Sequence, residues 1–369
     1  MKILIIISSL DIGGAENHLL NILPLLKSRG LELTVYSLKP GGVVGTRLKQ
    51  RGIRVIEPGF GVVGPLRDFL LFIHIIVKLY VIRPDIIHFF LPKAYLIGGT
   101  ASLFKPFIRR VMSRRSLNLY QKKRPVSKRI EHLLHKRMYR ILGNSNAVLE
   151  DLRKEGVPKD RLGLIYNGVL FLQSDETRSG NKRKEWGIGD DVFIIIYVAN
   201  LVEYKGHADL LHALSQARDN MPAEWRLICV GRDEGIKDQL AKLANSLDIA
   251  ASVLFAGERS DIHELLSCSD LGVIASHQEG FSNSLLEKMS AGLPVIATDV
   301  GGNGEAIIDN ESGVLVPPGA PALMAKAVLT LANDTSLRSR LGRNARERVR
   351  QHFSLEHCAD QYFDLYTQR

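Results

Sequence analysis

The sequence has 369 residues, a length that exceeds one ordinary hydrophobic core and suits two domains of about 150–200 residues each. Its three cysteines, Cys229, Cys268 and Cys358, lie far apart, which argues against a disulfide framework and a cysteine zinc site. Residues 1–168 contain 29 Lys and Arg against 11 Asp and Glu, which gives a net charge of +18. The remaining residues have a net charge of −8, so the whole chain carries +10. We therefore expect a protein of the reducing cytoplasm whose first half meets an anionic surface or ligand.

The first half alternates short apolar runs with amphipathic stretches. Residues 2–8 form a continuous apolar run, typical of a strand covered on both faces, and a turn at 11–14 leads into a helix at about 15–28. Further strands are expected at 33–37, 54–57, 85–89, 140–143 and 162–166. Helices are expected at 65–82, from about residue 94, and from caps at 144–146 to about residue 155. Strands that alternate with helices predict a parallel, doubly wound α/β sheet.

Two stretches of the first half point to surfaces. Residues 69–79 are the most apolar helical stretch, shorter than the ~20 residues of a membrane span, and predict a buried or interfacial helix. Residues 105–140 carry 13 Lys and Arg and one acid, Glu131. A solvated basic face is the plain interpretation, and nucleic-acid binding is not expected because no such motif accompanies the charge. Docking on an anionic membrane is favoured by interleaved apolar residues, namely Phe104, Phe107, Leu117, Leu119 and Tyr120.

The second half repeats the α/β rhythm. A polar segment at 173–184 predicts the boundary between domains at 1–172 and 173–351, with a C-terminal helix in 352–369. Strands are expected at 192–198, 226–230, 253–256, 271–275, 294–297 and 314–316, with helices between them. Ligands of doubly wound sheets bind at the carboxyl ends of the strands, so the cleft between two such domains is the expected site.

Three loops at predicted strand ends offer modest signals. Gly13 and Gly14 precede a helix start and allow close approach of a ligand to the backbone, although a tight structural turn fits equally well. His88 could shuttle a proton or bond a sugar hydroxyl, or could be a core histidine. Lys205, directly after an apolar strand, is a candidate cation for a diphosphate.

The fourth loop, within residues 276–305, gives the strongest signal. Glu279 and Gly280 lie in a loop before a helix start at Ser282 or Asn283, and Glu287 lies inside that helix. A helix N-terminus suits a phosphate, and carboxylates accept hydrogen bonds from sugar hydroxyls. This loop could therefore hold both parts of a sugar nucleotide, with an ordinary surface position as the alternative for Glu287.

These motifs resemble those of the family 4 glycosyltransferases (glycosyl transferases group 1), retaining enzymes of the GT-B fold that use nucleotide-sugar donors. The resemblance covers nearly the whole chain. Gly13–Glu16 is similar to the family's N-terminal glycine loop, and residues 165–169 are similar to the segment before its interdomain linker. Tyr204–His207 resembles its lysine motif, and residues 279–287, with Gly301, Gly302 and Glu305, resemble its paired-glutamate motif.

The resemblance implies two Rossmann-like domains that face across a cleft, with the C-terminal helix packing back toward the N-terminal domain. It implies that Glu279 contacts the transferred sugar, that Lys205 neutralises the diphosphate and that Glu287 contacts the ribose. Further donor contacts are implied for the glycine loop and for the backbone of the fourth loop, at Gly14, Gly280, Phe281, Ser282 and Asn283.

The chain departs from the family pattern at two positions. Many members have an arginine five residues before the lysine, where this chain has Asn200, so one cation for the diphosphate would be absent. Many also carry His-x-His after the fourth strand, whereas His88 is followed by Phe89 and Phe90. We keep Asn200 as a donor-site residue and His88 as a catalytic candidate.

The expected activity is retaining transfer of a hexose from a UDP- or GDP-sugar to a glycan or lipid-linked glycan in surface polysaccharide or glycolipid biosynthesis. No metal or other cofactor is expected, because the chain has no Asp-x-Asp motif. The expected location is the cytoplasm, with peripheral association at the inner face of the membrane through residues 105–140. A sugar-nucleotide epimerase of the same fold and a non-catalytic nucleotide-sugar-binding protein remain as alternatives.

Overall fold

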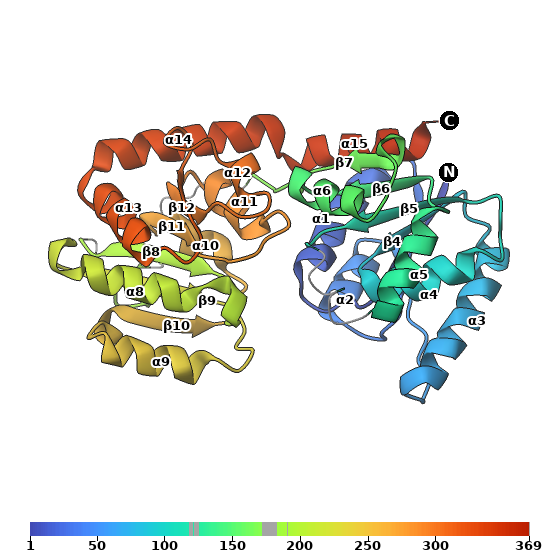
Figure 1. Cartoon of the computed structure of the whole chain (residues 1–369), viewed down its shortest axis with the longest axis horizontal. Coiled ribbons are helices and arrows are strands. Elements are labelled where there is room, and N and C mark those ends of the chain that lie inside the picture. Colours follow the sequence, from blue (N-terminus) through green and yellow to red (C-terminus); the bar gives the residue numbers. More distant parts are fainter. Residues whose placement is uncertain (118–120, 122–124, 172–182, 190, 369) are drawn as a thin grey trace. The chain divides into compact units, whose positions relative to one another are not determined.

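The computed structural model describes residues 1–117, 121, 125–171, 183–189 and 191–368, and the chain divides into two compact units (Figure 1). Unit 1 comprises Met1–Gly168 and Leu355–Arg369, and unit 2 comprises Val169–Ser354. The boundary predicted at residue 173 lies outside the described residues. The chain passes from unit 1 to unit 2 after Gly168 and returns after Ser354.

Unit 1 is built on a seven-stranded sheet of parallel strands in the order β3-β2-β1-β4-β5-β6-β7. The central strands are buried on both faces, which is why they read as continuous apolar runs. The strands are β1 Lys2–Ile7, β2 Glu32–Ser37, β3 Arg54–Ile56, β4 Ile86–Phe90, β5 Arg109–Arg114, β6 Arg140–Gly143 and β7 Leu162–Leu164.

Helices cover both faces of this sheet. One face packs against α1, α2 and α15, and the other packs against α3, α4, α5 and α6. The C-terminal helix α15 therefore belongs to unit 1, where it contacts α1. The helices are α1 Gly14–Ser28, α2 Val43–Gln50, α3 Gly64–Ile82, α4 Pro92–Ser102, α5 Pro125–His135, α6 Asn146–Lys154 and α15 Leu355–Thr367.

Strand β5 lies within the basic stretch and is not predicted from the sequence. Arg110 and Arg114 of this strand are buried. The Arg110 guanidinium donates to the carbonyl oxygens of Ser102 and Lys105, and Arg114 pairs with Glu131 and Glu155. Residues 105–140 therefore do not form one continuous basic surface, because part of their charge is used inside the unit.

Unit 2 repeats the architecture with six parallel strands in the order β10-β9-β8-β11-β12-β13. The strands are β8 Phe193–Val198, β9 Trp225–Val230, β10 Val253–Gly257, β11 Leu271–Ile274, β12 Val295–Thr298 and β13 Val314–Val316. The helices are α8 His207–Ala217, α9 Lys237–Ser246, α10 Ile262–Ser267, α11 Asn283–Ser290, α12 Asn303–Ala306, α13 Pro321–Asn333 and α14 Thr335–His352.

Both sheets run outward from their first strand in the order of a Rossmann fold, which places three successive strands on one side and the next strands on the other. The predicted fold class of two doubly wound, Rossmann-like domains is confirmed. At the two passages of the chain, the Val169 N–H donates to the Phe353 carbonyl at 3.0 Å, and Val169 bridges to Ser354. Among the described residues, no helix is both long and apolar enough to cross a membrane.

Candidate active site

The strongest candidate residues of unit 2 follow two neighbouring strands. Strands β8 and β11 pair at the point where the strand order reverses, and ligands of doubly wound sheets bind at the carboxyl ends of such a pair. The loops after these strands touch, because the His277 N–H donates to the Tyr204 carbonyl at 2.8 Å. Gly206 has a φ of +68°, and a Cβ there would lie 2.0 Å from the Ala275 oxygen. Glycine is therefore required for the two loops to approach this closely.

Lys205 and Glu279 meet between these loops. The Lys205 Nζ lies 2.7 Å from Glu279 Oε1, which also accepts a hydrogen bond from the Ser276 hydroxyl at 2.8 Å. The buried Tyr197 hydroxyl donates to the Lys205 carbonyl, and burial raises the pKa of this tyrosine. The two charged side chains are only 18% and 13% exposed, so both are held in place yet reachable. An anionic ligand can draw Lys205 to itself and leave Glu279 to accept hydrogen bonds.

Helix α11 begins next to this pair. Its N-cap is Ser282, whose hydroxyl accepts a hydrogen bond from the Leu285 N–H at 3.3 Å. The Phe281 ring is buried and packs against Phe353, with 5.3 Å between the ring centroids. The ring is thus a core contact, and a ligand at this helix start would meet backbone rather than the Phe281 side chain.

The Gly-Gly turn after β12 supports the same loop from the other side. Gly301 has a φ of +55°, and a Cβ there would lie 1.9 Å from the Glu279 carbonyl oxygen. The Gly302 N–H donates to the Gly280 carbonyl at 2.9 Å. The two glycines therefore fix the backbone that carries Glu279.

Two family models match this chain. The model described as Glycosyltransferase Family 4 matches residues 12–169, and the one described as Glycosyl transferases group 1 matches residues 179–348. The chain belongs to the family 4 glycosyltransferases. This confirms the family that the sequence motifs resemble.

Similar glycosyltransferases support this assignment. The N-acetyl-alpha-D-glucosaminyl L-malate synthase of Bacillus anthracis is 30% identical over 60% of this chain and 58% of its own length. The putative glycosyltransferase EpsD of Bacillus subtilis (strain 168) is 33% identical over 56% of this chain and 53% of its own. The chain thus spans a little over half the length of these curated relatives.

Solved glycosyltransferase structures match over the whole chain. Anabaena Alr3699/HepE in complex with UDP-glucose has a TM-score of 0.89 and 25% identity, with all of both chains covered. A glycosyltransferase from Rickettsia africae ESF-5 has a TM-score of 0.82 and 21% identity over 100% of this chain and 98% of its own. The GT-B fold follows from these similarities.

A buried lysine of this glycosyltransferase, Lys288, was not predicted as part of the site. Its Nζ donates to the Ser284 hydroxyl at 2.6 Å, and that hydroxyl donates to the Val198 carbonyl at the end of β8. Burial lowers the pKa of Lys288 to about 7, although the neighbouring Glu287 opposes the shift. The partly exposed Glu287 has a raised pKa, mainly through loss of water, and Lys288 opposes that shift. Helical spacing could have placed Lys288 on the inner face, because it follows the buried Leu285 by three residues.

At Asn200, where many family 4 glycosyltransferases have an arginine, an arginine of the next loop lies nearby. The Asn200 Oδ1 accepts a hydrogen bond from the Arg232 N–H at 3.2 Å, and its Nδ2 lies 3.5 Å from a carboxylate oxygen of Glu234. The Arg232 guanidinium pairs with Glu234 at 2.6 Å and is half exposed. The sequence gives no hint of this neighbour, because the two loops belong to different strands.

The two candidate residues of unit 1, Gly14 and His88, lie in different surroundings. Gly14 is the first residue of α1, directly after the carboxyl end of β1, as expected for a glycine loop. His88 is fully buried in β4, with Nδ1 2.6 Å from the Tyr366 hydroxyl and Nε2 2.8 Å from the Ser113 hydroxyl. Burial lowers its pKa to about 3. This arrangement matches the core histidine that the sequence also allowed, and it does not place the ring where a ligand could touch it.

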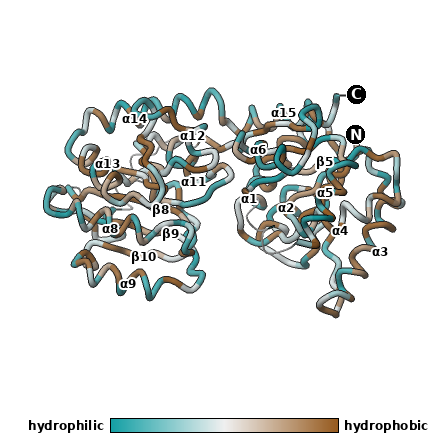
Figure 2. Tube along the Cα trace, viewed as in Figure 1, coloured by the Kyte–Doolittle hydropathy of each residue, from teal (hydrophilic) through white to brown (hydrophobic). Residues whose placement is uncertain are grey.

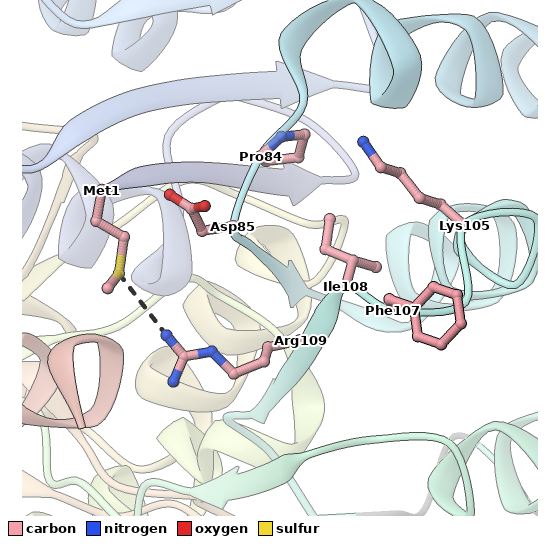
Figure 3. Close-up of a pocket in the computed structure, with 7 residues that line it drawn as sticks. All are labelled: Met1, Pro84, Asp85, Lys105, Phe107, Ile108 and Arg109. Atoms are coloured by element: carbon pink, nitrogen blue, oxygen red, sulfur yellow. Dashed lines mark hydrogen bonds between the residues drawn. The ribbon is translucent and has the colours of Figure 1, made fainter. Parts of the chain in front are cut away.

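A hollow of about 630 Å³ lies at the amino-terminal ends of the unit 1 strands, opposite the carboxyl ends that carry the candidate loops (Figure 3). Its lining includes Met1, Asp85 and Arg109, which stand at the amino-terminal ends of β1, β4 and β5. The glycine loop follows the carboxyl end of β1. The hollow is therefore not part of the candidate site of this glycosyltransferase.

Proposed function

We propose that this protein transfers a hexose from a UDP- or GDP-sugar, with retention of configuration, to a glycan or lipid-linked glycan in surface polysaccharide or glycolipid biosynthesis. The observation that carries the proposal is the Lys205–Glu279 pair at the reversal point of the unit 2 sheet, beside the start of α11. The family supports glycosyl transfer, and the UDP-glucose bound by HepE supports a nucleotide-sugar donor.

In the proposed reaction, the bond between the sugar C1 and the phosphate oxygen breaks, and a bond from the acceptor oxygen to C1 forms on the same face. The departing phosphate takes the proton of the acceptor hydroxyl, so no separate base is needed and the burial of His88 is no obstacle. Lys205 and the N-terminus of α11 offset the charge of the leaving diphosphate. Glu279 holds hydroxyls of the transferred sugar, whose C1 gains oxocarbenium character, and Glu287 holds the ribose.

We also propose that transfer needs no metal ion or other cofactor. The sequence has no Asp-x-Asp motif, and Lys205, which pairs with Glu279 after β8, is the cation that we assign to the diphosphate. Arg232, beside Asn200, is a second cation of the same unit. Activity that survives EDTA is the expected result, and loss of transfer on chelation with recovery on adding Mg²⁺ would contradict it.

The basic first half further supports a cytoplasmic protein at the inner membrane face, with an anionic lipid-linked acceptor. No nucleic-acid partner is proposed.

A panel of UDP-, GDP- and ADP-sugars in a thermal-shift assay tests the donor. The preferred donor should raise the melting temperature, because a ligand at 100 times its Kd stabilises the fold by about 2.7 kcal/mol. Transfer to membrane extracts is then assayed with that donor, and the anomeric configuration of the product is determined.

Other outcomes of this experiment would overturn the proposal. A changed sugar without any acceptor would indicate an epimerase, and donor binding without turnover would indicate a binding protein. The variant Glu279→Ala should lose transfer and still fold, because its side chain lies in a loop, although loss of its contacts with Lys205 and Ser276 should lower the melting temperature. Unchanged turnover in this variant would remove Glu279 from the site.

A further inference from the structure

Helix α3 is apolar on two opposite faces. Its inner face, Leu71, Ile75 and Leu79, is fully buried in unit 1. On the opposite face, apolar side chains follow one another at helical spacing and are 43–59% exposed, namely Leu66, Phe69, Ile73, Val77 and Tyr80. Figure 2 shows α3 coloured as hydrophobic along much of its length. A helix of a water-soluble domain normally turns polar residues outward, so this outer face requires an explanation.

The segment after α4 extends this apolar face. Leu103 and Phe104 are exposed, and Phe107 is 99% exposed (Figure 3). The segment is fixed beside the end of α3, because the Tyr80 hydroxyl donates to the Phe104 carbonyl at 2.8 Å and Phe104 packs on Phe72. A fully exposed phenylalanine on an anchored segment costs hydration free energy that an apolar partner would recover.

Helix α5 is amphipathic in the reverse sense. Its charged Glu131 and its His135 point into unit 1, where they reach Arg114 and Glu155. Its outward stripe is apolar and exposed, consisting of Val126, Ile130 and Leu133 at spacings of four and three residues. Since α3 and α5 both pack against α4, the two stripes border the same layer of helices.

Exposed apolar side chains are concentrated here. Of the 22 exposed large hydrophobic residues in the described part of the chain, 17 lie in unit 1 and 5 in unit 2. Twelve of the 17 lie on α3, the 103–107 segment and α5, namely Leu66, Phe69, Ile73, Val77, Tyr80, Val81, Leu103, Phe104, Phe107, Val126, Ile130 and Leu133. We call these twelve residues the apolar face.

The charges around the apolar face are positive. Arg83 follows α3, and the exposed cations on and after α5 are Lys128, Arg129, Lys136 and Arg137. Of the nearby carboxylates, Asp68 pairs with Lys93 at 2.7 Å, Glu131 pairs with the buried Arg114, and Asp85 accepts a hydrogen bond from the Lys2 N–H. A second copy of the chain docked face to face would bring cations against cations, whereas an anionic lipid surface would meet them with opposite charge.

We propose that the apolar face inserts into the headgroup region of an anionic bilayer, with the cations of α5 against the lipid phosphates. This deepens the membrane association of the proposed function and extends it from the basic stretch 105–140, which contains Phe107 and α5, to α3. An interfacial helix buries its apolar side about 5–10 Å into the boundary between headgroups and acyl chains, which suits the depth of one row of side chains.

Vesicle flotation with the full chain tests the proposal. The protein should bind vesicles of phosphatidylcholine and phosphatidylglycerol at low salt, and should bind pure phosphatidylcholine more weakly. The double variant Phe69→Asp, Ile73→Asp should bind anionic vesicles at least about tenfold more weakly. Burial of each apolar side chain that it removes contributes about a tenfold gain in vesicle affinity. The matched control is Leu254→Asp, Leu323→Asp, which changes two equally exposed residues of unit 2 and should bind like the wild type.

A fluorescent reporter gives an independent readout. The variant Phe107→Trp should show blue-shifted emission and quenching by brominated lipids, and Leu254→Trp should show neither. Replacing Lys128 and Arg129 by Gln should weaken binding about fivefold per side chain at low salt.

Three results would overturn the inference. The first is absence of vesicle binding by the wild type at low salt, and the second is vesicle binding by the Phe69, Ile73 variant equal to that of the wild type. The third is a wild-type dimer that the Phe69, Ile73 variant dissociates, because a second copy of the chain would then cover the apolar face. Thermal shifts with the donor are measured on the same variants. Intact donor binding with lost vesicle binding separates failure of this inference from failure of the proposed function.

Discussion

Lys205 is held at three points: its Nζ pairs with Glu279, its carbonyl accepts from Tyr197, and its loop is bonded to His277 through Tyr204. A lysine is flexible in solution, and fixing its side chain in advance reduces the entropy lost when a diphosphate binds. The backbone contacts of Tyr204 and Lys205 would hold the loop in place if the Lys205 side chain left Glu279 for a diphosphate.

Lys205→Met should weaken UDP binding roughly 10–100-fold, the range expected for one charge-assisted hydrogen bond with the unpaired Glu279 left nearby. Affinity for uridine, which has no phosphate, should change less than about twofold. Isothermal titration with both ligands checks this, with Lys326→Met on α13 as the control. Equal loss of affinity for uridine and UDP would show that Lys205 acts on the nucleoside or on the fold.

Lys288 couples the fold to pH. Burial lowers its pKa from 10.5 to about 7, so between these values the unfolded chain binds a proton that the folded chain does not. The free energy of unfolding therefore rises with pH in this window, and the cost of burying the charge is fully present below pH 7.

Relative to Lys288→Met, the wild type should gain up to about 1.4 kcal/mol of stability per pH unit as the pH rises from 7 toward 10. Urea unfolding of both proteins at pH 7, 8 and 9 measures the difference, in which titrating groups remote from Lys288 cancel. Lys326→Met, an exposed lysine, should follow the wild type. Parallel pH profiles for wild type and Lys288→Met would mean that Lys288 keeps its proton in the fold.

At the scale of elements, α15 completes the core of unit 1. Its Tyr366 hydroxyl bonds His88, and its Cys358 and Tyr362 are buried with the residues of α1 and β1. The carbonyl oxygens of Tyr366 and Gln368 accept hydrogen bonds from Arg109 of β5. The helix thus contacts three neighbouring strands of the sheet, β1, β4 and β5.

Tyr366→Phe should lower the stability of unit 1 by about 1–3 kcal/mol, because it leaves a buried nitrogen of His88 without its partner. Tyr80→Phe removes a hydroxyl that bonds a carbonyl at the surface and should cost less than about 0.5 kcal/mol. Urea unfolding measures both, and donor affinity should be unchanged in both. Reduced transfer with unchanged stability in Tyr366→Phe would instead point to His88 as a catalytic group.

The elements that could be predicted from sequence are those whose pattern is local. Strand β1 is a continuous apolar run, and α11 begins at a serine cap before Leu285 and Leu286. Strand β5 escaped prediction because three of its six residues are arginines. Arg114 is tolerated inside the unit because Glu131 and Glu155, which are distant in sequence, pair with it. Arg110 is tolerated because its guanidinium donates to the carbonyl oxygens of Ser102 and Lys105, just before the strand.

The candidate site shows the same limit. Lys205 and Glu279 were predicted from motifs in loops, and the structure brings them together because β8 and β11 are neighbours. Arg232 was missed, because a neighbouring loop is a property of the folded chain rather than of any short pattern. Lys288 was missed although its spacing from Leu285 favours the inner face of α11, because a lysine is normally expected at the surface. His88 could not be assigned, because its partner Tyr366 lies 278 residues further along the chain.

At the scale of the whole molecule, alternation of strands and helices was enough to predict two Rossmann-like domains. The polar segment 173–184 predicts a domain boundary at residue 173, which lies outside the described residues. In the structure the chain leaves unit 1 after Gly168, and Val169 of unit 2 bonds Phe353 beside the returning chain. That pairing depends on the far end of unit 2, which no local pattern reports.

The return of the chain into unit 1 also sets the order in which the protein is completed during synthesis. Domains usually fold in the order in which the ribosome makes them. Here unit 2 has all its residues once Ser354 is made, while unit 1, started first, still lacks the helix that covers α1. The nascent chain therefore carries an unfinished apolar surface through the synthesis of unit 2, and unit 1, although begun earlier, is completed later than unit 2.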